Sequence, residues 1–62
     1  MCIATAYLDH SGQIEQIMQD VVSAEYDDNG VSLTTILGER QHYKATIKHI
    51  DFIKHTLTIQ SS

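Results

Sequence analysis

The sequence predicts an all-β fold, and three features of the chain carry this prediction. Asn29 and Gly30 lie between two runs rich in strand-forming residues, 22–26 and 31–36, which is the usual signature of a β-hairpin. Residues 42–48 alternate between polar and apolar side chains, as a strand with one buried face requires. The chain also contains no proline and no internal repeat. We therefore expect a small antiparallel SH3-like barrel or a curled sheet of five to six short strands.

Turn-forming residues divide the chain into these strands. Residues 9–12 end in a glycine and follow the first expected strand, residues 2–8. Asn29 and Gly30 both tolerate a positive φ, so we place them at the centre of a tight hairpin whose twist matches its flanking strands. The remaining turns are expected at residues 38–40 and near Lys54 and His55.

The segment 13–26 fits two descriptions. Its apolar residues follow the stripe of an amphipathic helix, but they also fit two short strands, 14–18 and 21–26. We choose the strands. Asp20 is expected to form a local bend or a single helical turn between them, because an aspartate side chain can accept hydrogen bonds from nearby backbone amides.

Strand period predicts which side chains of the second half face the core. The residues expected to point inward are Tyr43, Ala45, Ile47, Ile50, Phe52, Leu57 and Ile59. The residues expected to point outward are His42, Lys44, Thr46, Lys48, Thr56 and Thr58.

A calcium-binding loop is an alternative interpretation of the acidic turn that contains Asp27 and Asp28. Such a loop needs alternating oxygen ligands and a distant bidentate glutamate, and this spacing is missing from the sequence. We therefore interpret these residues as part of the hairpin turn.

The length of 62 residues allows only one domain, residues 1–62, near the lower size limit for a single hydrophobic core. Self-association would help so small a domain. Its apolar share of 42% is typical of folded proteins, so we expect it to fold. The sequence has no apolar run of about 18 residues, no signal-peptide pattern, and a single cysteine that cannot form an internal disulfide. We expect a cytoplasmic protein that is not bound to a membrane.

The formal net charge is −4, and the two signs of charge occupy different halves of the chain. No lysine or arginine precedes Arg40, and seven of the eight acidic residues do. One hypothesis is an RNA-binding module that uses the basic strip Arg40, Lys44 and Lys48, with Tyr43 as a stacking surface. We favour exposed ion pairs between acidic strands of the first half and basic strands of the second. Proteins that bind nucleic acid mainly by neutralising its phosphates are usually basic, so we do not expect nucleic acid as the main partner.

Signatures of catalysis are scarce. The sequence has no glycine-rich phosphate loop, and its four histidines show neither metal-helix spacing nor a neighbouring nucleophile. A chain this small also offers little room for a substrate pocket of about 300 Å³. We expect that the protein is not an enzyme.

Cys2 differs from an ordinary lone cysteine, which is most often a small buried hydrophobe, because of its position. The Met1 amine, the Cys2 amide nitrogen and the Cys2 sulfur would close two fused five-membered rings around a metal ion. This planar donor set suits Ni(II), which favours square-planar sites. If Met1 is removed, the amine and sulfur of Cys2 still close one ring. Copper and zinc stay open as alternatives, since Cu(II) outcompetes Ni(II) at most such sites.

One chain supplies two or three ligands, which leaves a four-coordinate ion incomplete. In a two-fold homodimer whose termini meet near the axis, two Cys2 side chains could share one metal. His10 is a poor further ligand, because eight residues of straight strand would place it about 26 Å away. His42, His49 and His55 stay open as further ligands.

The sequence resembles the CooT family of small nickel-binding proteins over nearly its whole length. The similarity is carried by the segments 1–4, 20–21, 33–39 and 45–51, which read MCIA, DV, LTTILGE and ATIKHID. The combination of the Met-Cys start with the Leu-Gly-Glu and Ile-Asp segments is fairly specific.

The resemblance implies a small β-barrel homodimer that binds Ni(II) through Cys2. It also implies an accessory, metallochaperone-like role, with nickel delivery to carbon monoxide dehydrogenase in some organisms. Only Cys2 carries over from the family as a site residue.

Overall fold

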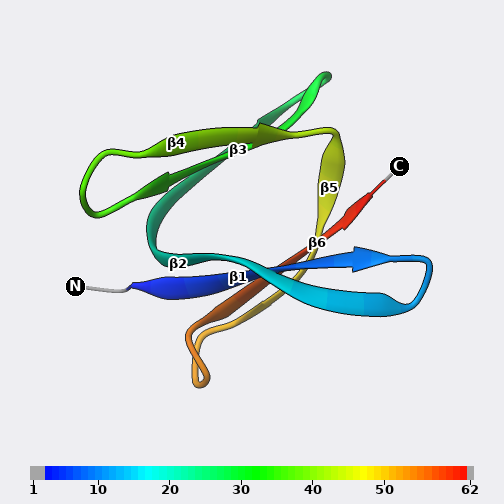
Figure 1. Ribbon diagram of the computed structural model, residues 1–62, viewed down its shortest axis with the longest axis horizontal. Helices are drawn as coiled ribbons and strands as arrows, with labels where there is room; N and C mark the ends of the chain where they lie inside the picture. Colours follow the sequence, from blue (N-terminus) through cyan, green and yellow to red (C-terminus); the bar gives the residue numbers. More distant parts are fainter. Residues whose placement is uncertain (1–2, 62) are drawn as a thin grey trace.

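The computed structural model describes residues 3–61, and these residues form a single curled sheet of six strands (Figure 1). The strands are β1 (Ala4–His10), β2 (Gln13–Asp27), β3 (Gly30–Thr35), β4 (Arg40–Tyr43), β5 (Ala45–Asp51) and β6 (Thr56–Ser61). Their order in the sheet is β4-β3-β2-β1-β6-β5, so β4 and β5 form its two edges. The predicted all-β fold is confirmed. One pairing differs from the antiparallel expectation, because β1 and β6 run parallel.

The segment expected to form two short strands is one long strand, β2. Asp20 lies within it at a positive φ of 59°. The pairing with β1 shifts register once between Gln16 and Met18 and once between Met18 and Val21. These shifts place extra residues in β2, and extra residues bend and twist a strand. The bend predicted at Asp20 is therefore present, but it curls the strand rather than ending it. The first half of β2 pairs with β1 and the second half with β3.

The hairpin between β2 and β3 forms as predicted, with a different turn. Asp28 and Asn29 take the central positions, and among the described residues only Gly30 of this turn has a positive φ, 133°. A Cβ atom on Gly30 would lie 2.1 Å from the carbonyl oxygen of Tyr43. Glycine is therefore required here by the close approach of β4 rather than by a turn with two positive φ angles.

The turn after β3 begins two residues earlier than predicted. β3 ends at Thr35, whose carbonyl accepts a hydrogen bond from the N–H of Gly38 (2.9 Å) and whose hydroxyl accepts one from the N–H of Glu39 (3.1 Å). Gly38 has a φ of 92°. Ile36, expected at the end of the strand, is consequently in the turn.

Lys44 forms a bend that separates β4 from β5 and carries the chain around a corner of the sheet. The predicted alternation is confirmed through this bend. Ala45 is buried, Tyr43 and Ile47 are half-buried and pack against the core, and the intervening polar residues are exposed.

The core lies on the concave side of the curled sheet and draws on five of the six strands. Its buried residues are Ala6, Val21, Val31, Leu33, Ala45, Leu57 and Ile59. Leu57 and Ile59 confirm the prediction for β6, where Thr56 and Thr58 are half-buried.

The prediction that Ile50 and Phe52 enter the core is wrong. Ile50 is 45% exposed and Phe52 is 79% exposed. Ile50 lies opposite buried Leu57 in the β5–β6 pair, so the two side chains are on the same face of the sheet. However, β5 is an edge strand, and no further strand covers Ile50. Phe52 lies in the turn beyond the end of β5. Both side chains border an opening in the core.

Within the described residues no helix is long and apolar enough to span a membrane.

Candidate metal centre

The two residues predicted to bind metal, Met1 and Cys2, lie outside the described residues. The description begins at half-buried Ile3, and β1 starts at Ala4. The structure therefore bears on the predicted site through its surroundings, which are the start of β1 and the elements packed beside it.

The start of β1 is held between two other strands. Ala4 pairs with Val21 of β2, and Thr5 pairs with Thr56 of β6. The N–H of Thr5 also donates a hydrogen bond of 2.9 Å to the carbonyl oxygen of His55 in the β5–β6 turn. In the sequence, Cys2 thus lies two residues before a strand that is paired on both sides.

Asp51 organises the turn on which Thr5 depends. Its Oδ1 accepts hydrogen bonds from the N–H groups of Lys54 (2.9 Å) and Ile53 (3.0 Å). The bond from Lys54 is the main reason that the pKa of Asp51 is lowered from its ordinary value, with partial burial acting in the opposite direction. This local network positions the carbonyl of His55 beside β1.

An apolar groove of about 230 Å³ opens beside Ala4. It is a continuation of the core, because it reaches buried Val21 and Leu57 between the exposed side chains of Val22 and Phe52. Its complete lining is Ala4, Val21, Val22, Ser23, Ala24, Ile50, Phe52 and Leu57. We call it the N-terminal groove.

Two turns with exposed apolar residues lie on either side of the N-terminal end of β1 (Figure 1). The β3–β4 turn carries Leu37, which is 87% exposed, and the β5–β6 turn carries Phe52 and Ile53, which are 79% and 90% exposed. Of these residues, Phe52 also lines the N-terminal groove. In the sequence, the signal for these exposed apolar groups is the adjacent pair Phe52 and Ile53 in an otherwise polar turn.

The histidines do not form a metal site in the described part of the chain. No group of three histidine, aspartate or glutamate side chains is arranged to hold an ion there. His10 lies at the far end of β1 from Ala4, where its Nδ1 is 2.6 Å from the hydroxyl of Ser61. His42 and His49 are exposed on β4 and β5, and His55 is exposed beside the start of β1.

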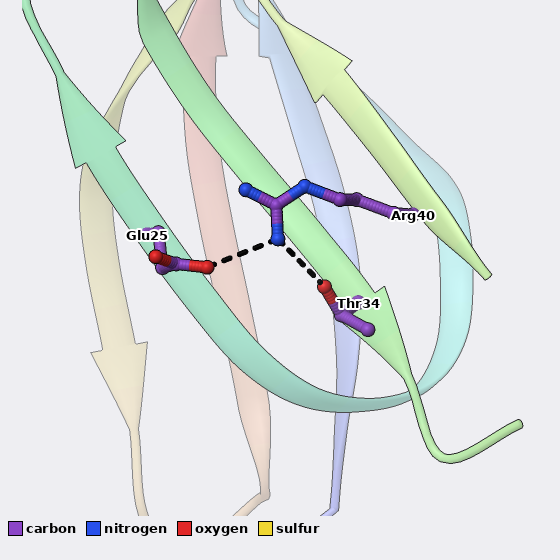
Figure 2. A network of polar contacts seen from close by, with 3 residues as sticks. All are labelled: Glu25, Thr34 and Arg40. Carbon is purple, nitrogen blue, oxygen red and sulfur yellow. Dashed lines mark hydrogen bonds and ion pairs between the residues drawn. The ribbon is translucent and has the colours of Figure 1, made fainter. Parts of the chain in front are cut away.

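The residues of the hypothetical RNA-binding strip are largely engaged with acidic residues of the first half. Figure 2 shows Arg40 of β4, whose Nη1 lies 3.0 Å from Oε1 of Glu25 on β2 and 3.5 Å from the hydroxyl of Thr34 on β3. Tyr43, the suggested stacking surface, is half-buried against the core. The Arg40–Glu25 pair is of the kind that the charge distribution of the sequence predicted.

A second ion pair joins Lys48 of β5 to Asp9 of β1. Asp9 is only 3% exposed, and its Oδ1 also accepts a hydrogen bond of 3.0 Å from the N–H of Gly12. The hydrogen bond from Lys48 is the main cause that lowers the pKa of Asp9, and burial opposes it. This carboxylate is therefore a structural anion that fixes β1 against β5 across β6.

The expectation about pocket size needs correction, because open surface grooves of about 430 and 620 Å³ are present. The larger one is lined by Leu8, His10, Gln13, Ile14 and Glu15. Small size therefore does not by itself argue against an enzyme.

The sequence matches the family model for CooT, described as CO dehydrogenase accessory protein CooT, over residues 1–60. A solved structure assigned to CooT from Carboxydothermus hydrogenoformans superposes with a TM-score of 0.88 at 24% sequence identity, covering 98% of each chain. At this identity the structural likeness establishes the fold. No curated protein matches the sequence at a significant level. The chain belongs to the CooT family, a family of CO dehydrogenase accessory proteins rather than of catalysts.

Proposed function

We propose that the protein is a nickel-binding accessory protein that works as a homodimer and delivers Ni(II) to a nickel enzyme such as carbon monoxide dehydrogenase. In this proposal Cys2 is the principal ligand, and the metal lies where two N-terminal ends meet. Membership of a CO dehydrogenase accessory family supports the role.

The chemistry of the donor set suits nickel. The Cys2 thiolate, the Cys2 amide nitrogen and the Met1 amine would form two fused chelate rings in one plane, and Ni(II) favours square-planar coordination. Metal binding would displace the thiol proton and the amide proton, so affinity should rise with pH. A thiolate from the second chain would complete the four ligands.

The N-terminal groove supplies the reason for a second chain. Val22, Ile50 and Phe52 leave apolar surface exposed beside Ala4, and a second copy that covers this surface would bury it. Cys2 precedes Ala4 by two residues, which span at most about 7 Å of chain. A two-fold axis near the groove would therefore bring two Cys2 residues within reach of one ion.

The observation that carries the proposal is the place of β1 in the fold. The strand that follows Cys2 is held on both sides and borders the N-terminal groove. The histidines of the described chain form no competing site.

Titration of the purified protein with Ni(II) tests the proposal. We expect thiolate charge-transfer absorption that saturates at about one metal per dimer, and we expect Cys2→Ser to abolish it. His42→Gln is the matched control, because His42 is an exposed potential ligand on β4, and this variant should titrate like the wild type. Undiminished nickel binding by Cys2→Ser would refute the proposed site.

A further inference from the structure

We propose that Asn29 is a site of spontaneous covalent modification, at which the side-chain amide is lost as ammonia and residue 29 becomes aspartate or isoaspartate. The site is the turn between β2 and β3, where Asn29 directly precedes Gly30. We call residues 27–30 the hairpin tip. Figure 1 shows the hairpin tip projecting beyond the rest of the sheet, at the top of the view.

The reaction joins two neighbouring groups of the chain. The backbone nitrogen of Gly30 attacks Cγ of Asn29, and the amide proton of Gly30 passes through water to the side-chain nitrogen, which leaves as ammonia. A cyclic succinimide remains, and water opens it at one of two bonds. Cleavage between Cγ and the Gly30 nitrogen gives aspartate. Cleavage between the backbone carbonyl carbon of residue 29 and the same nitrogen gives isoaspartate.

The sequence at the hairpin tip favours ring closure at this one position. Gly30 has no side chain that could obstruct the approach to its nitrogen, and its backbone is the least restricted of any residue type. Asn29 is the only asparagine in the chain, and no aspartate precedes a glycine. The expected product is therefore confined to residue 29.

The structure leaves the reacting side chain open to solvent. Asp28 and Asn29 are the central residues of the turn, and both are exposed. The N–H of Asn29 donates a hydrogen bond of 2.7 Å to Oδ1 of Asp27, which holds the backbone of the turn. The exposed carboxamide can rotate toward the nitrogen of Gly30 without displacing a buried group.

Only the end of the strand pairing has to open for the reaction. The pair of Asp27 with Gly30 is the last of the β2–β3 ladder, and the next pair contains buried Val31. Asp27 is exposed and Gly30 is half-buried, so opening the last pair uncovers little apolar surface. Local openings of this kind have the smallest free-energy cost in a folded protein. We therefore expect the folded chain to react at a rate within about tenfold of the unfolded chain.

Ionisable groups of both kinds surround the hairpin tip. Asp27 and Asp28 line one groove together with Lys44, and Cε1 of His42 lies 3.2 Å from the position of a Cβ on Gly30. The carboxylates disfavour an anion at the nitrogen of Gly30, whereas a cation favours it. Because these influences oppose each other, loss of the amide proton itself should govern the pH dependence, and the rate should rise with pH.

The two products should affect the fold differently. Both add a carboxylate to the hairpin tip, but isoaspartate also adds one methylene group to the backbone before Gly30. Gly30 cannot move toward β4, because a Cβ there would already lie 2.1 Å from the carbonyl oxygen of Tyr43. The added length must bulge outward and disrupt the pair of Asp27 with Gly30. Isoaspartate should therefore loosen the β2–β3 hairpin.

The test incubates the metal-free wild-type chain in ¹⁸O-labelled water, once folded and once in urea, so the outcome does not depend on nickel binding. Mass spectrometry of peptides locates the labelled oxygen. We expect it at residue 29 in the folded sample, with release of one ammonia for each oxygen gained. Methylation by an isoaspartyl methyltransferase should identify part of the product as isoaspartate.

Variants assign the reaction to the pair of Asn29 and Gly30. Asn29→Gln keeps an exposed carboxamide but would require a larger ring, so it should lose the product. Asp28→Asn combined with Asn29→Gln keeps an asparagine in the same exposed turn but not before a glycine, and it should also lose the product. Both changes are at exposed positions, so these variants should fold.

A comparison of the two purified products tests the effect on the fold. They carry the same charge and differ only in the path of the backbone, so the isoaspartate form should unfold at a lower urea concentration. It should also shift the amide signals of Val31 and Tyr43, which are paired across β3 and β4.

Three results would overturn the inference. The first is a product that forms in urea but not in the folded chain, which would show that the hairpin closes the site. The second is the same rate of product formation in the Asp28→Asn, Asn29→Gln protein as in the wild type. The third is identical urea unfolding of the aspartate and isoaspartate forms, which would contradict the close fit of Gly30 against β4.

Discussion

The two ends of the molecule leave different kinds of surface unsatisfied. At the N-terminal end the core is open, and Val22, Ile50 and Phe52 expose apolar side chains. At the opposite end, the exposed groups include the edge of β5 and the side chains of Asp27 and Asp28. Apolar surface favours a lasting interface with a copy of the chain, whereas polar surface suits a transient partner.

The largest effect is expected at Gly30, where the β2–β3 hairpin approaches β4. Gly30→Ala should destabilise the fold by about 3 kcal/mol or prevent folding, because the new Cβ would meet the carbonyl of Tyr43 and φ is 133°. Gly12→Ala is the control. Nothing lies within 4 Å of a Cβ there, so only the backbone cost of about 1 kcal/mol applies. Urea unfolding measures both, and equal losses would contradict the close approach of β4.

The next effect tests the apolar end directly. Phe52→Asp should weaken homodimerisation about 30-fold, because it places a charge in the N-terminal groove. Tyr26→Asp introduces the same charge at an aromatic residue of similar exposure, 77% against 79%, and should leave the dimer intact. Sedimentation equilibrium distinguishes the two. Dissociation caused by Tyr26→Asp but not by Phe52→Asp would show that the dimer interface lies away from the N-terminal groove.

A smaller effect concerns the ion pair between Asp9 and Lys48. The folded-state pKa of Asp9 is lowered from its ordinary value of 3.8, so the unfolded chain takes up a proton first as the pH falls. The stabilisation is complete above the unfolded pKa and is lost as pH falls through the folded pKa. Thermal unfolding between pH 6 and 2 should show this loss in the wild type and a flatter profile in Asp9→Asn. Identical profiles would show that Lys48 does not stabilise the ionised carboxylate.

The smallest effect is expected at the exposed pair of Arg40 and Glu25. These side chains are 55% and 65% exposed, so Arg40→Gln should change stability by no more than about 0.5 kcal/mol. The dependence of the remaining effect on salt concentration checks the electrostatic cause. A loss above about 1.5 kcal/mol would show that Arg40 contributes through packing rather than through charge.

Local patterns in the sequence predicted much of the fold. The hairpin before Gly30, the alternation around Ala45 and the burial of Leu57 follow from residue type and strand period, which act over a few positions. Whether β5 is an edge strand depends on the order of strands in the whole sheet. Period alone therefore placed Ile50 and Phe52 in the core, although nothing covers them there.

The site was predictable to a different extent. The Cys2 ligand and the homodimer came from the sequence and stay predictions, because the description of the structure begins at Ile3. The N-terminal groove could not be predicted, since it combines residues of β1, β2, β5 and the turn that follows β5. The curl imposed by the extra residues of β2 brings these elements together.

Nickel K-edge X-ray absorption of the loaded protein tests the metal site most directly. The wild type should show sulfur together with nitrogen scattering around a square-planar Ni(II), and Cys2→Ser should lose the sulfur contribution. A wild-type spectrum with only nitrogen and oxygen ligands would contradict a site built on Cys2.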